Sequence, residues 1–338
     1  MSKTVSIRGA VTANNSAGEI AQAVTKLVDR IYFKNGITDS EVVNIMLSVS
    51  GDLTSFSPAR ALREAGHNVP LMSCVEPNVD GSLANCIRVM VTAQSEHPIS
   101  HVYLGGARAL RTDITANYAI ALDGPSGAGK STVAKIVAKK LGITYLDTGA
   151  LYRALGLKCL NEGVSPSDSA TVKNCLENVS VDIVYTDGIQ RVMLDGEDVS
   201  GKIRTPEVSM AASAVSAIPY VREKLLGIQR DIAKSNSVIL DGRDIGTVVL
   251  PSAEFKFFLT ASAEIRAKRR FDELIEKGNK VVYEDIYNDV ITRDHNDSTR
   301  AVAPLKCAYD AEEIVSDNMT AEEVADKIIS DVAEVVGL

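Results

Sequence analysis

Short apolar runs alternate with longer segments of helical spacing over the last two-thirds of the chain. The short runs are typical of buried strands and lie at 118–122, 238–240, 255–259 and 313–315. The longer segments predict helices at 168–178, 206–234, 263–277, 283–299 and 321–336, the second of them open to interruption at Pro219, while 181–199 is typical of a hairpin. Strands that alternate with helices indicate a parallel sheet.

The first third of the chain carries its own set of strand and helix patterns. Strand patterns lie at 5–7, 42–49, 69–74, 87–92 and 101–104. Ser16 and Glu19 form a capping-box pattern for a helix that ends at Gly36, and Ser57-Pro58 opens a second helix that ends near Gly66. These elements predict a separate mixed α/β domain without a nucleotide motif.

The strand at 118–122 breaks at Asp123 and leads into a glycine-rich loop. The stretch from Gly124 to Ser131 fits G-x-x-x-x-G-K-[ST], and a helical pattern follows it to Leu141. In this motif, backbone N–H groups and the helix N-terminus bind phosphate, the lysine reaches the β- and γ-phosphates, and the hydroxyl can bind Mg²⁺. We predict an ATP site with Lys130 as a catalytic residue and Ser131 as the Mg²⁺ ligand, lined by Gly124, Pro125, Ser126, Gly127, Ala128, Gly129, Lys130, Ser131 and Thr132.

The composition and net charge of the chain exclude several classes of protein. The chain has 338 residues, is 45% hydrophobic and has a net charge of −8, so it is globular and offers no basic face to nucleic acid. No apolar run approaches the length of a membrane span, and the N-terminus lacks a signal-peptide core. The five cysteines show no C-x-x-C spacing and the four histidines no metal-ligand spacing. We expect a cytoplasmic protein with reduced thiols and no structural zinc.

Cationic side chains stand at the ends of apolar strands in the first third. Arg8 and Arg111 lie near strand ends, and Arg88 begins the strand CIRVMV. An arginine at the start of such an apolar strand needs a partner, and an anionic ligand would supply one. A structural ion pair remains the alternative for any one of them.

These residues resemble the trimeric, barrel-type chorismate mutases over roughly Val5–Arg111. The matching segments are IRGAVT, SPARALRE, the stretch from Glu76 to CIRVMVT, and HVYL continuing to LR. The resemblance implies a pseudo-barrel fold, a homotrimer, and the rearrangement of chorismate to prephenate without a cofactor. It also implies that the enzyme holds a compact substrate conformer and stabilises negative charge on the ether oxygen.

The same resemblance implies a role for each site residue. Arg88 would face the ether oxygen, Arg8 and Tyr103 would bind carboxylate, and Glu76 would accept the ring hydroxyl. The remaining predicted substrate-binding residues are Arg60, Arg63 from a neighbouring subunit, Ser73, and Arg111 at the entrance. The segment before Glu76 is two residues shorter than the family pattern, which puts Ser73 where the family often has cysteine and Cys74 one step along. The family's C-terminal tail is also absent.

The last two-thirds of the chain also place cations around the glycine-rich loop. An acceptor that is itself a phosphate requires several cations to hold it against ATP. Asp244 ends a central strand, and the basic stretch 266–270 suits a lid over ATP, with Arg266 and Arg269 as predicted ATP ligands. The cations expected near the loop are Arg153, Arg204, Arg222, Arg243, Arg293 and Arg300.

This part resembles bacterial cytidylate kinase from about Tyr118 to Leu338. The matching segments are DGPSGAGKST, LDTGALYR, LDGEDVS, IRTPEVS, LDGRDIGTVV, RDHNDSTR and AVAPL. The resemblance implies that Thr148, Arg222 and Asp244 read the cytosine edge and that Asp297 and Arg300 hold sugar and base. It implies that Arg153, Arg243 and Arg293 hold the CMP phosphate. Thr148 stands where the family commonly has serine.

We therefore interpret the chain as a fusion of chorismate mutase and an ATP-dependent CMP/dCMP kinase. The predicted domains are 1–113 and 118–338, joined by a linker at 114–117, with an NMP-binding insertion at about 164–218 and a lid at about 263–280. Two alternatives remain: a catalytically silent first domain that trimerises or senses a metabolite, and a shikimate kinase as the second domain. The second would need an acidic pair after the loop helix, where the chain has Asp147 followed by Thr148-Gly149.

Overall fold

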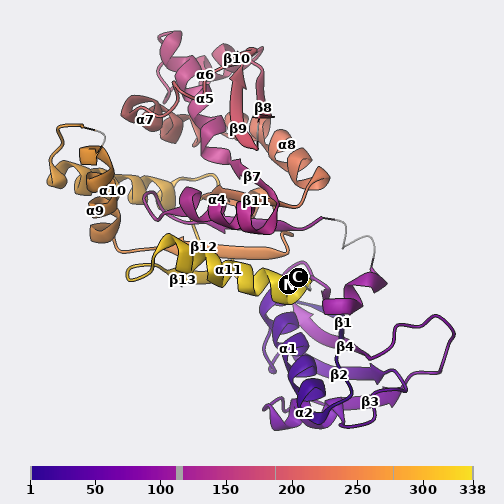
Figure 1. The fold of residues 1–338 in the computed structure, drawn as a ribbon. Coiled ribbons are helices and arrows are strands. Elements are labelled where there is room, and N and C mark those ends of the chain that lie inside the picture. The colour runs from indigo at the N-terminus through magenta and orange to yellow at the C-terminus, as the bar shows by residue number, and fades with distance from the viewer. Residues whose placement is uncertain (1, 112–116, 187, 277, 337–338) are drawn as a thin grey trace. The chain divides into compact units, whose positions relative to one another are not determined.

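The computed structural model describes residues 2–111, 117–186, 188–276 and 278–336 (Figure 1). The chain divides into two compact units: Met1–Ala116 with Ser330–Leu338, and Asn117–Ile329. Most of the predicted linker, 114–116, lies outside the described residues. No helix in these ranges combines the length and the apolar composition that crossing a bilayer requires.

The first unit is built on a mixed sheet in the order β3-β2-β4-β1-β5. Its strands are β1 (Lys3–Thr12), β2 (Val42–Val49), β3 (Leu71–Val75), β4 (Cys86–Ser95) and β5 (Val102–Leu104). β4 pairs antiparallel with β1 and β2, whereas the outer strands β3 and β5 run parallel to their neighbours. All the predicted strands of this unit are confirmed, although β1 and β4 are longer than their apolar patterns indicated.

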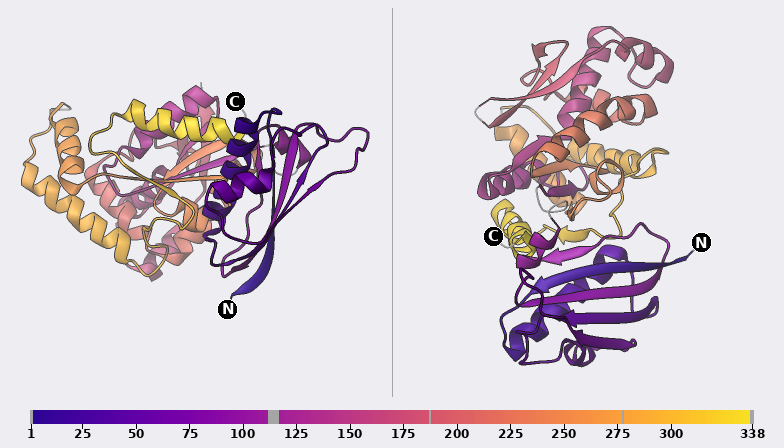
Figure 2. Two further views of the ribbon diagram at one scale, coloured as in Figure 1. Left: turned by 90° about the horizontal axis from the view of Figure 1, so that it is seen from below. Right: turned by 90° about the vertical axis from the view of Figure 1, so that its right-hand side faces the viewer.

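Helix α1 (Ala17–Asn35) packs on one face of this sheet (Figure 2). The Ser16 side chain accepts the N–H of Glu19, and Gly36 ends the helix in the left-handed conformation, as the capping pattern predicted. The Glu19 carboxylate accepts a hydrogen bond from Asn14, so only half of the capping box forms. Two short helices complete the unit, α2 (Pro58–Glu64) and the 3₁₀ helix η1 (Gly105–Leu110).

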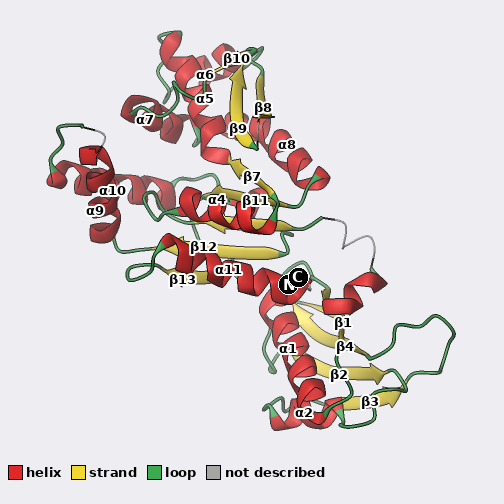
Figure 3. Ribbon diagram, in the orientation of Figure 1, coloured by secondary structure: helices red, strands yellow, loops and turns green. Residues whose placement is uncertain are grey.

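The second unit contains a fully parallel sheet in the order β13-β12-β6-β11-β7. Strand β6, which precedes the glycine-rich loop, is central in this order. Helix α4 (Lys130–Leu141), labelled in Figure 3, follows the loop. The predicted parallel α/β fold is confirmed. Its strands are β6 (Ala119–Asp123), β7 (Thr144–Asp147), β11 (Val238–Gly242), β12 (Phe255–Thr260) and β13 (Glu312–Val315).

A helical layer with a small antiparallel sheet, order β10-β9-β8, is inserted after β7. The helix predicted at 206–234 is in fact two, because α7 ends at Val215 and Pro219 begins α8 with its fixed backbone angle. The inserted elements are α5 (Thr148–Asn161), α6 (Ser169–Leu176), β8 (Val181–Thr186), β9 (Ile189–Leu194), β10 (Glu197–Asp198), α7 (Pro206–Val215) and α8 (Pro219–Ser235). They share one apolar core.

The remaining helices follow the central strands. A short π-helical turn, η2 (Ile245–Val249), follows β11, and α9 (Ala263–Glu276) with α10 (Tyr283–Thr299) forms a hairpin after β12. The last helix, α11 (Ala321–Val336), bears Glu322 and Asp326, which both pair with Lys140 of α4.

Candidate functional site

The glycine-rich loop joins the central strand β6 to helix α4 through a tight passage beside β12. Gly124 has a φ of 147°, and a Cβ on it would lie 1.9 Å from the carbonyl oxygen of Leu259. Only glycine fits there. Gly129 caps α4 with a φ of 91°, so the loop ends by directing the first N–H groups of the helix back over the loop.

Lys130 is buried within this loop. Its ammonium donates to the carbonyl of Pro125 at 2.7 Å. Burial first, and then the neighbouring Arg243, lowers the pKa of Lys130 well below its usual value, while Asp241 and Asp123 act in the opposite direction. A phosphate held by the loop would favour the charged lysine.

Asp241, at the end of β11, is a site residue that the motif search missed. Its carboxylate accepts hydrogen bonds from the Ser131 hydroxyl at 2.7 Å and from the Tyr145 phenol at 3.0 Å. Burial and the nearby Asp147 raise the pKa of Asp241 to about 6. A hydroxyl beside a carboxylate is the kind of oxygen set that Mg²⁺ prefers. The sequence signal was an acid that ends an apolar strand.

Asp244 lies at the centre of an ionic cluster beyond β11. It pairs with Arg222, and its other oxygen lies 3.6 Å from Arg300. Ser216, which the sequence did not single out, ties both arginines to α7: its carbonyl accepts from Arg222 at 3.0 Å and its hydroxyl lies 3.3 Å from Arg300. Arg222 and Asp244, which are predicted to read the base edge, therefore lie together with Arg300, which is predicted to hold sugar and base.

Thr148, the third residue predicted to read the base, does not join that cluster. Its hydroxyl donates to the main-chain carbonyl of Asp241 at 2.8 Å, and the residue is buried. This bond braces the start of α5 against β11, so the geometry favours a supporting role for Thr148 over direct contact with a base.

Two of the three predicted phosphate-binding arginines, Arg153 and Arg243, pair with aspartates. Arg153 pairs with Asp147 at 2.7 Å, and Arg243 pairs with Asp297 at 2.9 Å. Burial lowers the pKa of Arg293, and the positive charges of Arg243 and Arg153 lower it further. Arg204 is mostly exposed and reaches Asp147 only at 3.8 Å. The chain thus concentrates positive charge next to Lys130, where an anionic acceptor would stabilise it.

The two predicted lid arginines are engaged within the protein. Arg266 is buried, forms a two-pronged pair with Asp294, and donates to the carbonyl of Ser126 in the glycine-rich loop at 3.0 Å. Arg269 donates to the carbonyl of Ser316 at 2.7 Å. In this conformation they brace α9 against the loop and β13, and contact with ATP would require these bonds to be exchanged.

In the first unit, the strand register places one residue from each strand in a single row across the sheet. The row runs Cys74, Ser48, Arg88, Ala10 and Tyr103 in the order of the strands. Arg88 and Glu76 form an ion pair, and the Ser48 hydroxyl donates to the other oxygen of Glu76. Partners in register project to the same face. Gly9, next to Ala10 on β1, faces Leu27 and Ile31 of α1, so the row lies on the opposite face.

The register also decides between Ser73 and Cys74. Ser73 lies opposite Leu47, whose side chain is buried in the core, whereas Cys74 lies opposite Ser48 in the row. A one-residue shift moves a side chain to the other face of a strand. The register therefore places Cys74 in the row and the predicted substrate contact Ser73 on the other face of the strand.

The other predicted mutase residues divide into two groups. Arg8 lies opposite Met90, two residues along β4 from Arg88 and on the same face, and Arg111 lies over the Tyr103 ring at 5.5 Å. Arg60 and Arg63 lie on α2, which contacts α1 and β3. Arg60 pairs with Glu64 at 2.7 Å. These two arginines are not brought to the row within one chain.

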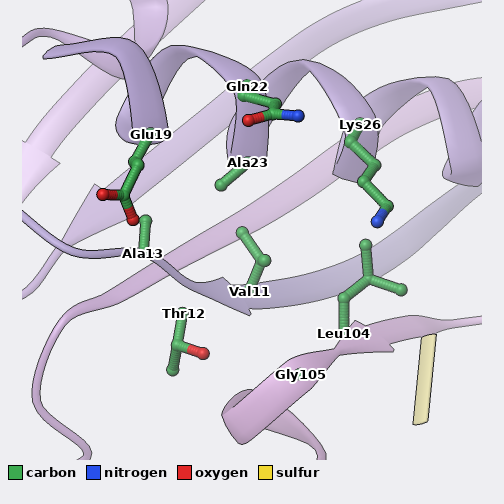
Figure 4. A pocket seen from close by; sticks show the side chains of 9 residues that line it. All are labelled: Val11, Thr12, Ala13, Glu19, Gln22, Ala23, Lys26, Leu104 and Gly105. Carbon is green, nitrogen blue, oxygen red and sulfur yellow. The ribbon is translucent and has the colours of Figure 1, made fainter. Parts of the chain in front are cut away.

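A separate pocket of about 270 Å³ opens beside α1 (Figure 4). None of the predicted site residues lines it. Its lining consists of Val11, Thr12, Ala13, Glu19, Gln22, Ala23, Lys26, Leu104 and Gly105.

The second unit has a glycine-rich loop between a central parallel strand and its helix, with arginines and aspartates nearby. This arrangement defines a P-loop phosphotransferase unit, and a mixed-sheet unit precedes it in the chain. Residues 120–334 match the cytidylate kinase family model, and residues 4–114 match the model for chorismate mutase type I. The chain therefore belongs to the cytidylate kinase family and carries a chorismate mutase type I domain before the kinase. Both are enzyme families, a phosphotransferase and an isomerase.

Several known proteins are similar to one part of the chain. A cytidylate kinase from Caldicellulosiruptor saccharolyticus is 55% identical over 218 residues, which are 64% of this chain and 96% of that protein. A chorismate mutase structure from Clostridium thermocellum is 38% identical and covers 31% of this chain and 98% of its own, with a TM-score of 0.30. A shikimate kinase structure from Acinetobacter baumannii is 17% identical, covers 65% of this chain and 95% of its own, and has a TM-score of 0.32, too low to support an argument about substrate.

Proposed function

We propose that the second unit transfers the γ-phosphate of ATP to CMP or dCMP. The supporting observation is the cluster of Asp244 with Arg222 and Arg300, which offers a carboxylate and two guanidinium groups to a base edge close to the P-loop. Arg153, Arg243 and Arg293 would hold the acceptor phosphate. The protein would act by positioning the two substrates and neutralising charge, without a covalent intermediate.

ATP would occupy the P-loop, with Lys130 at its β- and γ-phosphates. Mg²⁺ would be held by the Ser131 hydroxyl with Asp241 beside it, and it would neutralise phosphate charge. Within the chain, the Tyr145 hydroxyl donates to one oxygen of the Asp241 carboxylate and the Ser131 hydroxyl to the other.

An acceptor comparison tests this proposal. CMP, dCMP, UMP, AMP and shikimate are offered at equal concentration with ATP and Mg²⁺, and we expect CMP and dCMP to be used best. A site with unmatched buried polar groups rejects the wrong base strongly. Preference for shikimate would replace the proposal with the shikimate kinase alternative, and equal use of UMP would remove the base-reading roles.

We further propose that the first unit rearranges chorismate to prephenate. The support is the row across the sheet, which places the Arg88–Glu76 pair beside Tyr103 and near Arg8. Arg88 would stabilise the charge that develops on the ether oxygen, and Cys74 and Ser48 would flank it. No proton transfer and no cofactor are required.

The row is open on one side within a single chain, and we propose that a homotrimer completes it. Its face carries the exposed apolar side chains of Met46, Met72 and Met90, which are 41%, 61% and 39% exposed. Arg60 and Arg63 would then come from a neighbouring subunit. Light scattering of the intact protein measures the oligomeric state, and a monomer would contradict this completion.

Chorismate depletion tests the mutase proposal, with Arg88→citrulline as the decisive variant. Citrulline keeps most of the shape and donors but removes the charge, so we expect kcat to fall at least about a thousandfold. Arg88→Lys should recover part of the activity because it keeps a charge. A wild-type protein without mutase activity would favour the silent-domain alternative.

The domain boundaries at 113 and 118 and the cytoplasmic location remain predictions. The five cysteines are free thiols in the structure, which is compatible with a reducing compartment.

A further inference from the structure

Asp244 occupies a position where an aspartate ordinarily caps its own helix. It precedes η2 as the N-cap residue, yet its side chain makes no capping hydrogen bond. Its carboxylate pairs instead with Arg222 and Arg300. The first N–H groups of η2 therefore need acceptors from elsewhere.

Asp123, at the end of β6, supplies those acceptors. One carboxylate oxygen accepts the N–H of Ile245 at 2.8 Å, and the other accepts the N–H of Gly246 at 2.7 Å. Both bonds are buried, and Asp123 itself is 4% exposed. The residue immediately before the P-loop thus caps the turn that follows Asp244.

The approach of these groups is close. A Cβ on Gly246 would lie 3.4 Å from the Asp123 carboxylate and 3.1 Å from Cδ of Lys256. Lys256 is held by a buried pair with Asp310 at 2.7 Å, so the wall behind Gly246 cannot move freely. With both oxygens occupied by main-chain N–H groups, Asp123 is placed to fix the turn rather than to contact a substrate.

We propose that Asp123 is a positioning residue that caps η2 in place of Asp244 and thereby keeps the Asp244 carboxylate directed at the acceptor site. This inference rests on the proposed CMP kinase activity and adds a determinant of base selectivity to it. If the cap at Asp123 is weakened, Asp244 becomes the nearest alternative acceptor for the N–H groups of its own helix. Base selectivity would then fall before phosphate transfer itself is affected.

The test uses the full-length protein with Asp123→Asn, which replaces one acceptor by an N–H donor. We expect the ratio of kcat/KM for CMP to that for UMP to fall at least about tenfold, mainly through a higher KM for CMP. The KM for ATP should change less than about threefold, because the P-loop keeps its own contacts. Calorimetric binding of CMP without ATP should weaken in parallel.

Asp168→Asn is the matched control, because Asp168 caps α6 through the N–H of Ala170 and touches none of the site residues. Its CMP-to-UMP ratio should equal that of the wild type. Where Asp123→Asn does not fold, Asp123→Ser retains one acceptor and carries the same expectation.

Loss of selectivity in an Asp123 variant, with the control unchanged, supports the inference. An unchanged ratio of kcat/KM for CMP to that for UMP would overturn the inference. If both values fall equally, Asp123 has a merely structural role, and if neither falls, it has no role in the site. If the wild-type protein does not prefer CMP to UMP, the proposed function itself fails, and this outcome is visible before any variant is compared.

Discussion

Several side chains without a motif of their own hold the motif residues in place. The Asp241 carboxylate accepts a hydrogen bond from Ser131, and the Ser216 carbonyl accepts one from Arg222. The Ser48 hydroxyl donates a hydrogen bond to Glu76. Each lies on a different strand or helix from its partner. The spacing of residues in the sequence predicts neighbours within one helix or strand, so these contacts between different elements could not be predicted. The P-loop residues lie on one continuous segment, and their contacts could be predicted.

Ser48→Ala should reduce mutase activity without changing kinase activity. The hydroxyl fixes one oxygen of Glu76 while Arg88 holds the other, so its loss frees the carboxylate to rotate. We expect kcat/KM for chorismate to fall roughly tenfold, the effect of losing one hydrogen bond to a charged acceptor. Steady-state chorismate depletion measures it. An unchanged rate would show that Glu76 is oriented by Arg88 alone.

Asp123 should make the second unit lose stability as the pH rises. Burial raises the pKa of Asp123 from 3.8 to about 6, so the unfolded chain releases this proton first. Its contribution to the free energy of unfolding is therefore complete below about pH 4 and is lost as the pH passes about 6. Two pKa units correspond to at most roughly 3 kcal/mol.

Urea unfolding of the wild type and of Asp123→Asn at about pH 4.5 and 7 measures this difference. The side chain of the variant does not titrate. Between about pH 4.5 and 7 the free energy of unfolding of the wild type should therefore fall more than that of the variant. Equal changes in the two proteins would contradict the assignment, because Asp241 titrates in both.

At the scale of elements, the sequence predicted where strands and helices lie better than which face each residue takes. Ser73 was predicted as a substrate contact from the family resemblance, whereas the register of β3 places Cys74 in the row. A strand has a period of two, so a shift of one residue reverses the faces. Pro219, by contrast, has a local effect, and the break between α7 and α8 lies where its ring predicts.

Two glycine variants near α4 distinguish the stability cost of a steric clash from the cost of an unfavourable backbone conformation. Gly124→Ala places a Cβ 1.9 Å from Leu259 oxygen, whereas Gly142→Ala meets nothing within 4 Å and suffers only from a φ of 65°. We expect a cost of roughly 1 kcal/mol for Gly142→Ala and at least about 3 kcal/mol for Gly124→Ala, with loss of kinase activity. Thermal unfolding measures both, and similar costs would contradict the close passage of β12.

At the scale of the whole molecule, the two family matches occupy separate segments, 4–114 and 120–334. The fusion could be predicted because each part carries several separated motifs in order. The homotrimer, by contrast, was expected from the family resemblance alone, and it stays a proposal because contacts within one chain do not test it.

Lys130→Ala should abolish phosphoryl transfer to CMP and leave chorismate rearrangement within about twofold of the wild type. In the proposed function Lys130 contacts the phosphates of ATP, so its loss would remove charge stabilisation worth several orders of magnitude in rate. Both activities are assayed on the same preparation. Collapse of mutase activity in a folded variant would show that the two sites depend on each other.

The arginine–aspartate pairs of the kinase unit have a consequence for ionic strength. Arg153 and Arg243 already hold Asp147 and Asp297, so they carry internal counter-ions in place of ions from solution. If these arginines hold the acceptor phosphate, as proposed, an arriving nucleotide would displace a carboxylate of the protein rather than a bound chloride, and few ions would be released. The KM for CMP should therefore depend only weakly on salt concentration, and when the product leaves, the same carboxylates return to the arginines and compete against its rebinding.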